Sequence, residues 1–245
     1  MLTKDYEQLK LEHDLLLHLS RYDTPVGATT LVLVMDKEFG LSQASIGRKL
    51  MEFDALGYTE SVGRKGRVLA TTGRERLQSL ERELAKFRDN AKLMQALHVS
   101  DKQSLIDLLV ARRALERETV WLAAQHATEE QVNMLWESIA RQNKLMADGK
   151  IPIQEDREFH ELIAKASGNF ILLHALQLVW GEGAHLPATA LIRRSVGSEL
   201  VVDHQKIVEC IATGSPYEAA SAMVTHINQM IEDVHKYYDQ IHAQQ

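Results

Sequence analysis

The sequence has 245 residues, 45% of them hydrophobic and 25% charged, and a formal net charge of −6. A chain of this length and composition accommodates two modest globular domains. No apolar run reaches the roughly 20 residues that a membrane-spanning helix needs, and no signal-peptide pattern opens the chain. The single cysteine, Cys210, has no partner for an internal disulfide. We therefore expect a cytoplasmic protein without a membrane partner.

The acidic charge is confined to one part of the chain. Residues 1–76 carry 11 Lys/Arg and 11 Asp/Glu, whereas residues 77–245 carry 17 and 23 and account for the whole of the −6. Within residues 42–76 there are seven basic and four acidic residues, a local excess of +3. Phosphate contact depends on local rather than global charge, so this region is compatible with DNA binding.

Helical periodicity and turn residues divide the first hundred residues into a few elements. Three helices come first, and Ser42 caps the third of them. A hairpin of two short strands around a glycine-bounded basic turn follows, and then a charged helix. The predicted bounds are 3–20, 30–39 and 42–56 for the helices, 58–62 and 67–70 for the strands, and 74–97 for the charged helix.

The order of three helices and a hairpin is that of a winged helix-turn-helix, which we predict over residues 1–76. In such modules the recognition helix lies in the major groove, and the wing contacts phosphate or the minor groove. A small α/β scaffold without a DNA role is the alternative, but it gives no reason for a basic wing tip. The expected DNA contacts are Gln43, Ser45, Arg48 and Lys49 on the helix, with Arg64, Lys65 and Arg67 on the wing.

The remainder of the chain carries almost no strand signal. We predict a linker helix over residues 77–99 and an all-α, antiparallel helical bundle over residues 100–245, which makes the whole protein mainly α. Capping residues and glycines mark the helix ends. The predicted helices span 101–126, 129–147, 152–167, 169–181, 198–213 and 216–243.

One arginine occupies a core position of this bundle. Arg112 lies in the middle of the apolar stripe of helix 101–126, with Glu116 one turn later. A buried charge must be paired, because an unpaired one is too costly. Arg112 therefore either forms a structural ion pair with Glu116 or holds its guanidinium ready for the carboxylate of a ligand.

Three histidines and one carboxylate also point toward the bundle interior. Asp156 and His160 are four residues apart on one helical face, and His204 and His226 fall into the apolar stripes of two later helices. One inward histidine is more often a hydrogen-bonded core residue. Three with an aspartate predict a divalent metal site, with Zn or Ni expected first and Mn or Fe as alternatives. His174 is the candidate for a further pocket residue.

Segments 109–124, 156–169 and 204–226 together resemble the FCD sensor domain of the FadR subfamily of GntR-type transcription factors. Arg-x-x-Leu-Glu, Asp-x-x-x-His, Ser-Gly-Asn and the two late histidines occur in order with the expected spacing. The resemblance covers roughly residues 100–243. It implies a metal held by Asp156, His160, His204 and His226, an effector carboxylate on Arg112, a pocket donor at Asn169, and a homodimer that binds small organic acids.

The N-terminal region departs from this resemblance. Residues 30–39 lack the Leu-Pro-Ser-x-Arg-x-Leu stretch that usually precedes the recognition helix in GntR heads. The base-contact residues of that family therefore cannot be transferred to this chain. The operator sequence is left open.

We hypothesise a transcriptional repressor that binds a double-stranded DNA operator as a homodimer and is controlled by a small organic acid at a metal centre. Release of DNA on effector binding is the default expectation. A metalloenzyme in a helical bundle is the rival, since three histidines and an aspartate with an open position could activate water. A purely structural metal in a dimerisation domain is the third reading. The sequence identifies neither the metal nor the effector.

Overall fold

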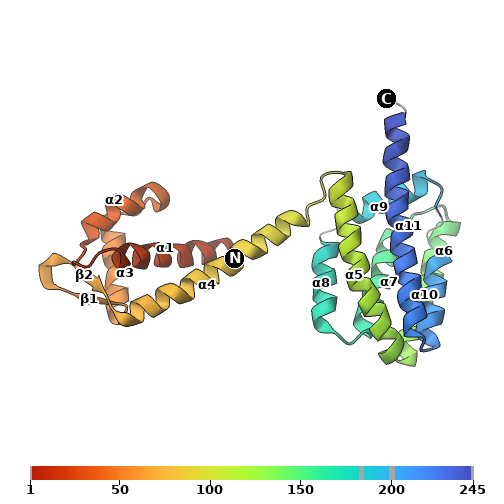
Figure 1. The fold of residues 1–245 in the computed structure, drawn as a ribbon, viewed down its shortest axis with the longest axis horizontal. Coiled ribbons are helices and arrows are strands. Elements are labelled where there is room, and N and C mark those ends of the chain that lie inside the picture. Colours follow the sequence, from red (N-terminus) through yellow and green to blue (C-terminus); the bar gives the residue numbers. More distant parts are fainter. Residues whose placement is uncertain (1, 182–184, 199–201, 244–245) are drawn as a thin grey trace. The chain divides into compact units, whose positions relative to one another are not determined.

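The computed structural model describes residues 2–181, 185–198 and 202–243. The chain divides into two compact units, Met1–Met94 and Gln95–Gln245. Both are built mainly from helices, and the strands of the described residues form one small two-stranded sheet (Figure 1). The mainly α fold that the sequence predicts is thereby confirmed.

The N-terminal unit has the element order of a winged helix. Three helices precede the β1–β2 hairpin, whose antiparallel register pairs Thr59 with Leu69. An isolated antiparallel β-bridge pairs Val26 with Arg67, so the chain before α2 lies alongside strand β2. The elements are α1 (Leu2–Ser20), α2 (Ala28–Phe39), α3 (Gln43–Ala55), β1 (Thr59–Ser61), the 3-10 turn η1 (Gly63–Lys65), β2 (Arg67–Leu69) and α4 (Thr71–Ala96).

Local signals explain the boundaries of the helix-turn-helix. Gly40 between α2 and α3 has φ of 59°, a left-handed conformation that glycine adopts without a steric penalty. Ser42 caps α3, since its hydroxyl accepts a hydrogen bond from the backbone N–H of Ser45 at 3.2 Å. Ile46, Leu50 and Phe53 on the inner face of α3 are fully buried in the core of this unit.

Helix α4 is part of this core along its first half. Leu77, Leu80 and Leu84 are buried, and Arg76 forms ion pairs with Glu12 of α1 at 2.8 Å and with Glu83 at 2.9 Å. The segment that the sequence analysis treated as a linker, 77–99, therefore begins inside the N-terminal unit. The division of the chain falls at Met94 and Gln95 rather than at residue 76.

The C-terminal unit is an all-helical bundle around α5. Helix α5 packs against α11, α7, α8 and α10, which come later in the chain. An aspartate capping box at Asp101 starts α5, and Thr128 provides the same device for α6. The helices are α5 (Lys102–His126), α6 (Glu129–Ala147), α7 (Ile153–Ala166), α8 (Phe170–Trp180), α9 (His185–Ser195), α10 (Val202–Ala212) and α11 (Pro216–Ala243).

Helix α9 is the one element that the sequence analysis did not predict. The predicted helices leave residues 182–197 without an element. Pro187 lies in the first turn of α9, where proline is tolerated because its missing N–H has no intrahelical acceptor. The predicted start of the following helix at 198 falls partly on residues 199–201, which lie outside the described residues. None of the described helices combines the length and apolarity needed to cross a membrane.

Candidate metal and effector site

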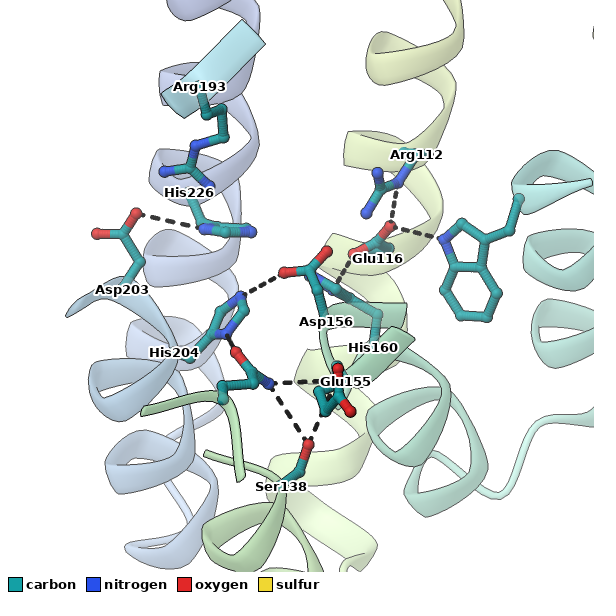
Figure 2. Close-up of polar contacts among 12 residues, drawn as sticks. Arg112, Glu116, Ser138, Glu155, Asp156, His160, Arg193, Asp203, His204 and His226 are labelled. Carbon is teal, nitrogen blue, oxygen red and sulfur yellow. Dashed lines mark hydrogen bonds and ion pairs between the residues drawn. The ribbon is translucent and has the colours of Figure 1, made fainter. Parts of the chain in front are cut away.

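Three helices bring three histidines together in the interior of the C-terminal unit. His160 comes from α7, His204 from α10 and His226 from α11, and their exposed fractions are 2%, 0% and 0%. One ligand nitrogen from each ring lies within 4.8 Å of the others. The structure thus brings together the three histidines that the sequence analysis selected, as Figure 2 shows.

Each imidazole is held at its Nδ1 atom by an acceptor from a different part of the chain. The partners are Glu116 Oε2 for His160 at 2.6 Å, Gln142 Oε1 for His204 at 2.9 Å and Asp203 Oδ2 for His226 at 3.3 Å (Figure 2). An acceptor at Nδ1 favours the tautomer with the proton there. The Nε2 atoms of all three rings are buried and have no hydrogen-bond partner among the described residues.

Burial keeps the rings of His204 and His226 neutral. It lowers the pKa of His204 well below its ordinary value, and the charges of the surrounding groups lower it further. Burial also lowers the pKa of His226, although the hydrogen bond to Asp203 acts in the opposite direction. A neutral imidazole with a fixed Nδ1–H and a bare Nε2 is the form that binds a divalent metal.

Asp156, the predicted fourth ligand, lies next to the histidines. Its Oδ1 atom is 3.5 Å from His204 Nε2, and its side chain is about a quarter exposed. The close group of ligand atoms in the described residues consists of the three histidines alone. Asp156 therefore lies at the edge of the histidine group, partly exposed to solvent, with one carboxylate oxygen close to His204.

Arg112 forms the ion pair with Glu116, which is one of the two roles that the sequence left open. Its Nε donates to Glu116 Oε1 at 2.8 Å, and both side chains are 1% exposed. Its two terminal nitrogens, Nη1 and Nη2, are buried and have no hydrogen-bond partner among the described residues. The ion pair is therefore present, and four N–H bonds are still available for an anion.

Glu116 connects the arginine to the histidine cluster. Oε1 also accepts a hydrogen bond from Trp180 Nε1 at 3.4 Å, while Oε2 faces His160. Burial raises the pKa of Glu116, but the charges of Arg112 and His160 and their hydrogen bonds outweigh it and hold the pKa well below the usual range. The carboxylate is therefore ionised in the interior.

Sequence reasoning missed two residues of this site, Gln142 and Arg193. Gln142 fixes His204 and is itself anchored to the backbone carbonyl of Glu155 at 3.2 Å. Arg193, 3% exposed, comes from the unpredicted α9, and its Nε lies 3.3 Å from Asp233 Oδ2. No local signal marks either residue, because their roles depend on which helices pack together.

A small cavity adjoins the cluster between α9 and the start of α7. Arg193, Thr189 and Asp156 contribute polar groups to its wall, and Ile151, Pro152 and Met230 contribute apolar ones. The space open to the centre of a water molecule is about 20 Å³, which is room for about one water.

Two predicted effector residues lie elsewhere. Asn169 is exposed and caps α8, since its Oδ1 accepts from the backbone N–H groups of Ile171 and Leu172. His174 is exposed on α8 and pairs with Gln177 at 2.9 Å. The structure corrects the expectation that they line the pocket, because capping and surface hydrogen bonds account for both side chains.

The predicted DNA contacts lie on α3 and the wing. Arg64 and Lys65 are exposed at the wing tip. Arg67 instead donates to Asp54 Oδ2 at 2.8 Å and ties the wing to the end of α3. On α3, Arg48 is exposed, whereas Gln43, Ser45 and Lys49 all have partners within the protein.

Comparisons with known proteins define the class of the chain. The C-terminal unit matches the FCD domain over residues 107–229. A protein of Escherichia coli named as an L-lactate dehydrogenase operon regulatory protein is 30% identical over 142 residues, which cover 55% of this chain and 53% of that protein. That alignment spans about half the length of the relative. The name of this relative is that of a transcriptional regulator, the class of protein that the sequence predicts.

The chain belongs to the GntR superfamily, in the group whose members carry an FCD domain. The transcriptional regulator LutR of Bacillus subtilis is 25% identical over 211 residues, 83% of this chain and 89% of the relative. Among solved structures, a GntR protein of Streptococcus agalactiae is similar at 20% identity and a TM-score of 0.45, with 91% of this chain and 99% of that chain covered.

Proposed function

We propose that the protein is a DNA-binding repressor whose C-terminal unit senses a small organic acid at a divalent metal centre. The observation that carries this proposal is the convergence of three buried Nε2 atoms that have no partner among the described residues. Leaving buried polar atoms unpaired costs free energy. A bound cation would satisfy all three at once.

The donor set fits a divalent ion of the transition series. His160, His204 and His226 would hold it, and Asp156 would supply a carboxylate oxygen from the side of the cavity. Nitrogen-rich sites of this kind suit Zn and Ni, with Mn and Fe as alternatives. Glu116, Gln142 and Asp203 orient the rings. The ion would supply a Lewis-acidic position for an anionic oxygen.

The arginine beside the cluster favours an anionic effector. Arg112 presents two buried terminal nitrogens that have no partner among the described residues and can receive a carboxylate in a bidentate manner. Arg193 adds a second guanidinium at the wall of the cavity. The E. coli relative takes its name from an L-lactate dehydrogenase operon. That name agrees with a small carboxylic acid as the ligand class.

Control of DNA binding follows from the small size of the cavity. The cavity has room for about one water molecule, so a carboxylic acid that binds there would have to move side chains or helices at its walls, which α9 and α7 form. We infer a homodimer in which this displacement lowers the affinity for a two-fold operator, since each half-site needs a correctly placed winged helix. A 100-fold preference of the effector for one state supplies about 2.7 kcal/mol of coupling.

Titration calorimetry with a panel of C2–C6 carboxylic acids, on metal-loaded protein, tests the sensor. Arg112→Ala is expected to weaken the binding of the preferred acid by at least tenfold, and His204→Ala to abolish it. Arg141→Ala and His235→Ala are the matched controls, because both side chains lie on the surface. The acid should also release a bound operator fragment from the unmodified protein. Equal binding by all four variants would overturn the site.

A further inference from the structure

The outward face of α3 carries an arginine and an exposed methionine. Ile46, Leu50 and Phe53 define the buried face, and with 3.6 residues per turn Arg48 and Met51 lie on the opposite side. Met51 is 58% exposed, and Arg48 is exposed as well. The exposed carboxylate of Glu52 flanks the same face and pairs with Lys49.

The other polar residues at the start of α3 are occupied within the protein. Gln43 donates its side-chain amide to Thr29 Oγ1 on α2 at 3.0 Å. Lys49 pairs with Glu52 at 2.9 Å and lies 5.6 Å from the centre of the Phe53 ring. Both contacts hold these side chains against the body of the unit. They are therefore poorly placed to read base edges.

Arg48 differs from them. Its side chain donates a 3.2 Å hydrogen bond to the hydroxyl of Ser45, one turn earlier on the same helix. That bond uses one N–H of Nη2 and leaves the rest of the guanidinium fork to other acceptors. It also fixes the direction of the side chain along the outer face. An arginine arranged in this way can address two acceptors in one plane.

Gly47, between Arg48 and the buried Ile46, has no packing reason to be a glycine. A Cβ added there would meet no heavy atom within 4 Å. Gly73, the other glycine inside a helix of this unit, would place a Cβ 2.2 Å from the carbonyl oxygen of Tyr58. Glycine destabilises a helix interior relative to alanine. Packing within the chain therefore does not account for the missing side chain at Gly47.

On the basis of the proposed DNA-binding function, we infer that Arg48 and Met51 select the operator sequence. The Arg48 fork donates to O6 and N7 of a guanine, and Met51 packs on the C5-methyl group of a neighbouring thymine. Gly47 lets the helix sit deep in the major groove between them. Gln43 and Lys49 act as positioning residues, and Arg64 and Lys65 contact phosphate without reading sequence.

Selection from a random pool of double-stranded DNA with the full-length protein tests this inference. Arg48→Ala is expected to remove the preference for guanine at one position of each half-site and to weaken specific binding by roughly 5- to 150-fold. Met51→Ala is expected to remove a thymine preference nearby with a smaller loss. Binding to a non-specific duplex at low salt should change by less than about threefold in both variants.

Gly47→Ala separates a DNA role from a structural one. Since alanine is the better helix former, this variant should have a higher unfolding temperature and yet bind the selected operator more weakly. Arg88→Ala and Met94→Ala are the controls, because both residues are exposed on α4, and their sequence selection should equal that of the unmodified protein.

Two outcomes overturn different parts of this account. If the unmodified protein binds no duplex even at low salt, the proposed function and this inference fall together. If it binds and selects a sequence, but Arg48→Ala and Met51→Ala select the same sequence with the same affinity, the inference alone is overturned. Weaker operator binding by Gly47→Ala together with a higher unfolding temperature supports the close approach of DNA.

Discussion

Glu116 is the residue on which the two halves of the candidate site depend. One of its oxygens lies 2.8 Å from Arg112 Nε and the other 2.6 Å from His160 Nδ1, and the whole side chain is buried. A buried carboxylate is stable there because the guanidinium of Arg112 and the imidazole of His160 face it. The same group therefore fixes a proposed metal ligand and a proposed effector contact.

Glu116→Gln keeps the shape of the side chain and removes its charge. Because an oriented, electron-rich imidazole binds metal more strongly, we expect the affinity for a divalent ion to fall by about 10- to 100-fold. Competition with a chromophoric chelator measures this change. Glu158→Gln, on the surface of the same unit, is the matched control. An unchanged affinity in Glu116→Gln would show that Glu116 does not orient the ligand.

The lowered pKa values of His204 and His226 predict how the stability of the metal-free protein depends on pH. In the unfolded chain a histidine takes up a proton near pH 6.5, whereas the buried rings resist it. The unfolded state therefore binds more protons below that pH, and the free energy of unfolding falls as the pH falls. The decrease is at most about 1.4 kcal/mol per pH unit for each ring.

Urea denaturation of metal-free protein between about pH 5.5 and pH 7.5 measures this decrease. The double variant His204→Ala/His226→Ala lacks both buried rings, so its stability should change less over the same range. Parallel curves for the two proteins would contradict the assignment of the pH dependence to these histidines.

Among the elements, the wing depends on one glycine. Gly66 has φ of 121°, and a Cβ there would lie 2.4 Å from the carbonyl carbon and oxygen of Val26. Gly66→Ala should therefore destabilise the N-terminal unit by about 1–3 kcal/mol. Gly27→Ala is the control, because a Cβ at Gly27 meets nothing within 4 Å. Thermal unfolding followed by circular dichroism distinguishes the two, and equal midpoints would refute the steric argument.

Most elements could be predicted because their ends carry local signals. Ser42, Asp101 and Thr128 cap helices through contacts within four residues, and these contacts are present in the structure. Helix α9 has no such signal and contains Pro187 in its first turn, so periodicity alone could not separate it from a loop. Its buried Arg193 was missed for the same reason.

The candidate site was predictable only in part. His160, His204 and His226 lie on apolar stripes, so their inward direction follows from helical periodicity. Gln142 could not be found in this way, because its role comes from the packing of α6 against α10. The family resemblance predicts Asn169 as a pocket donor, whereas asparagine is also a common helix cap. In the structure its side chain caps α8.

At the scale of the whole molecule, the proposed DNA binding belongs to the N-terminal unit and the proposed sensing to the C-terminal unit. The N-terminal unit presents an exposed arginine and a basic wing tip, and the C-terminal unit encloses the histidine cluster. Helix α4 is fastened to the first unit through Arg76 and Glu12. The division between the two units falls after Met94.

X-ray absorption spectroscopy at the metal edge of the metal-loaded protein tests the central claim most directly. The claim is that the three histidine Nε2 atoms bind a divalent ion. With zinc, the account predicts three imidazole ligands with Zn–N distances of about 2.0–2.1 Å, completed by oxygen donors. His204→Ala should lose one imidazole contribution, and the exposed control His235→Ala should lose none. A first shell of oxygen atoms without imidazole scattering would contradict the account.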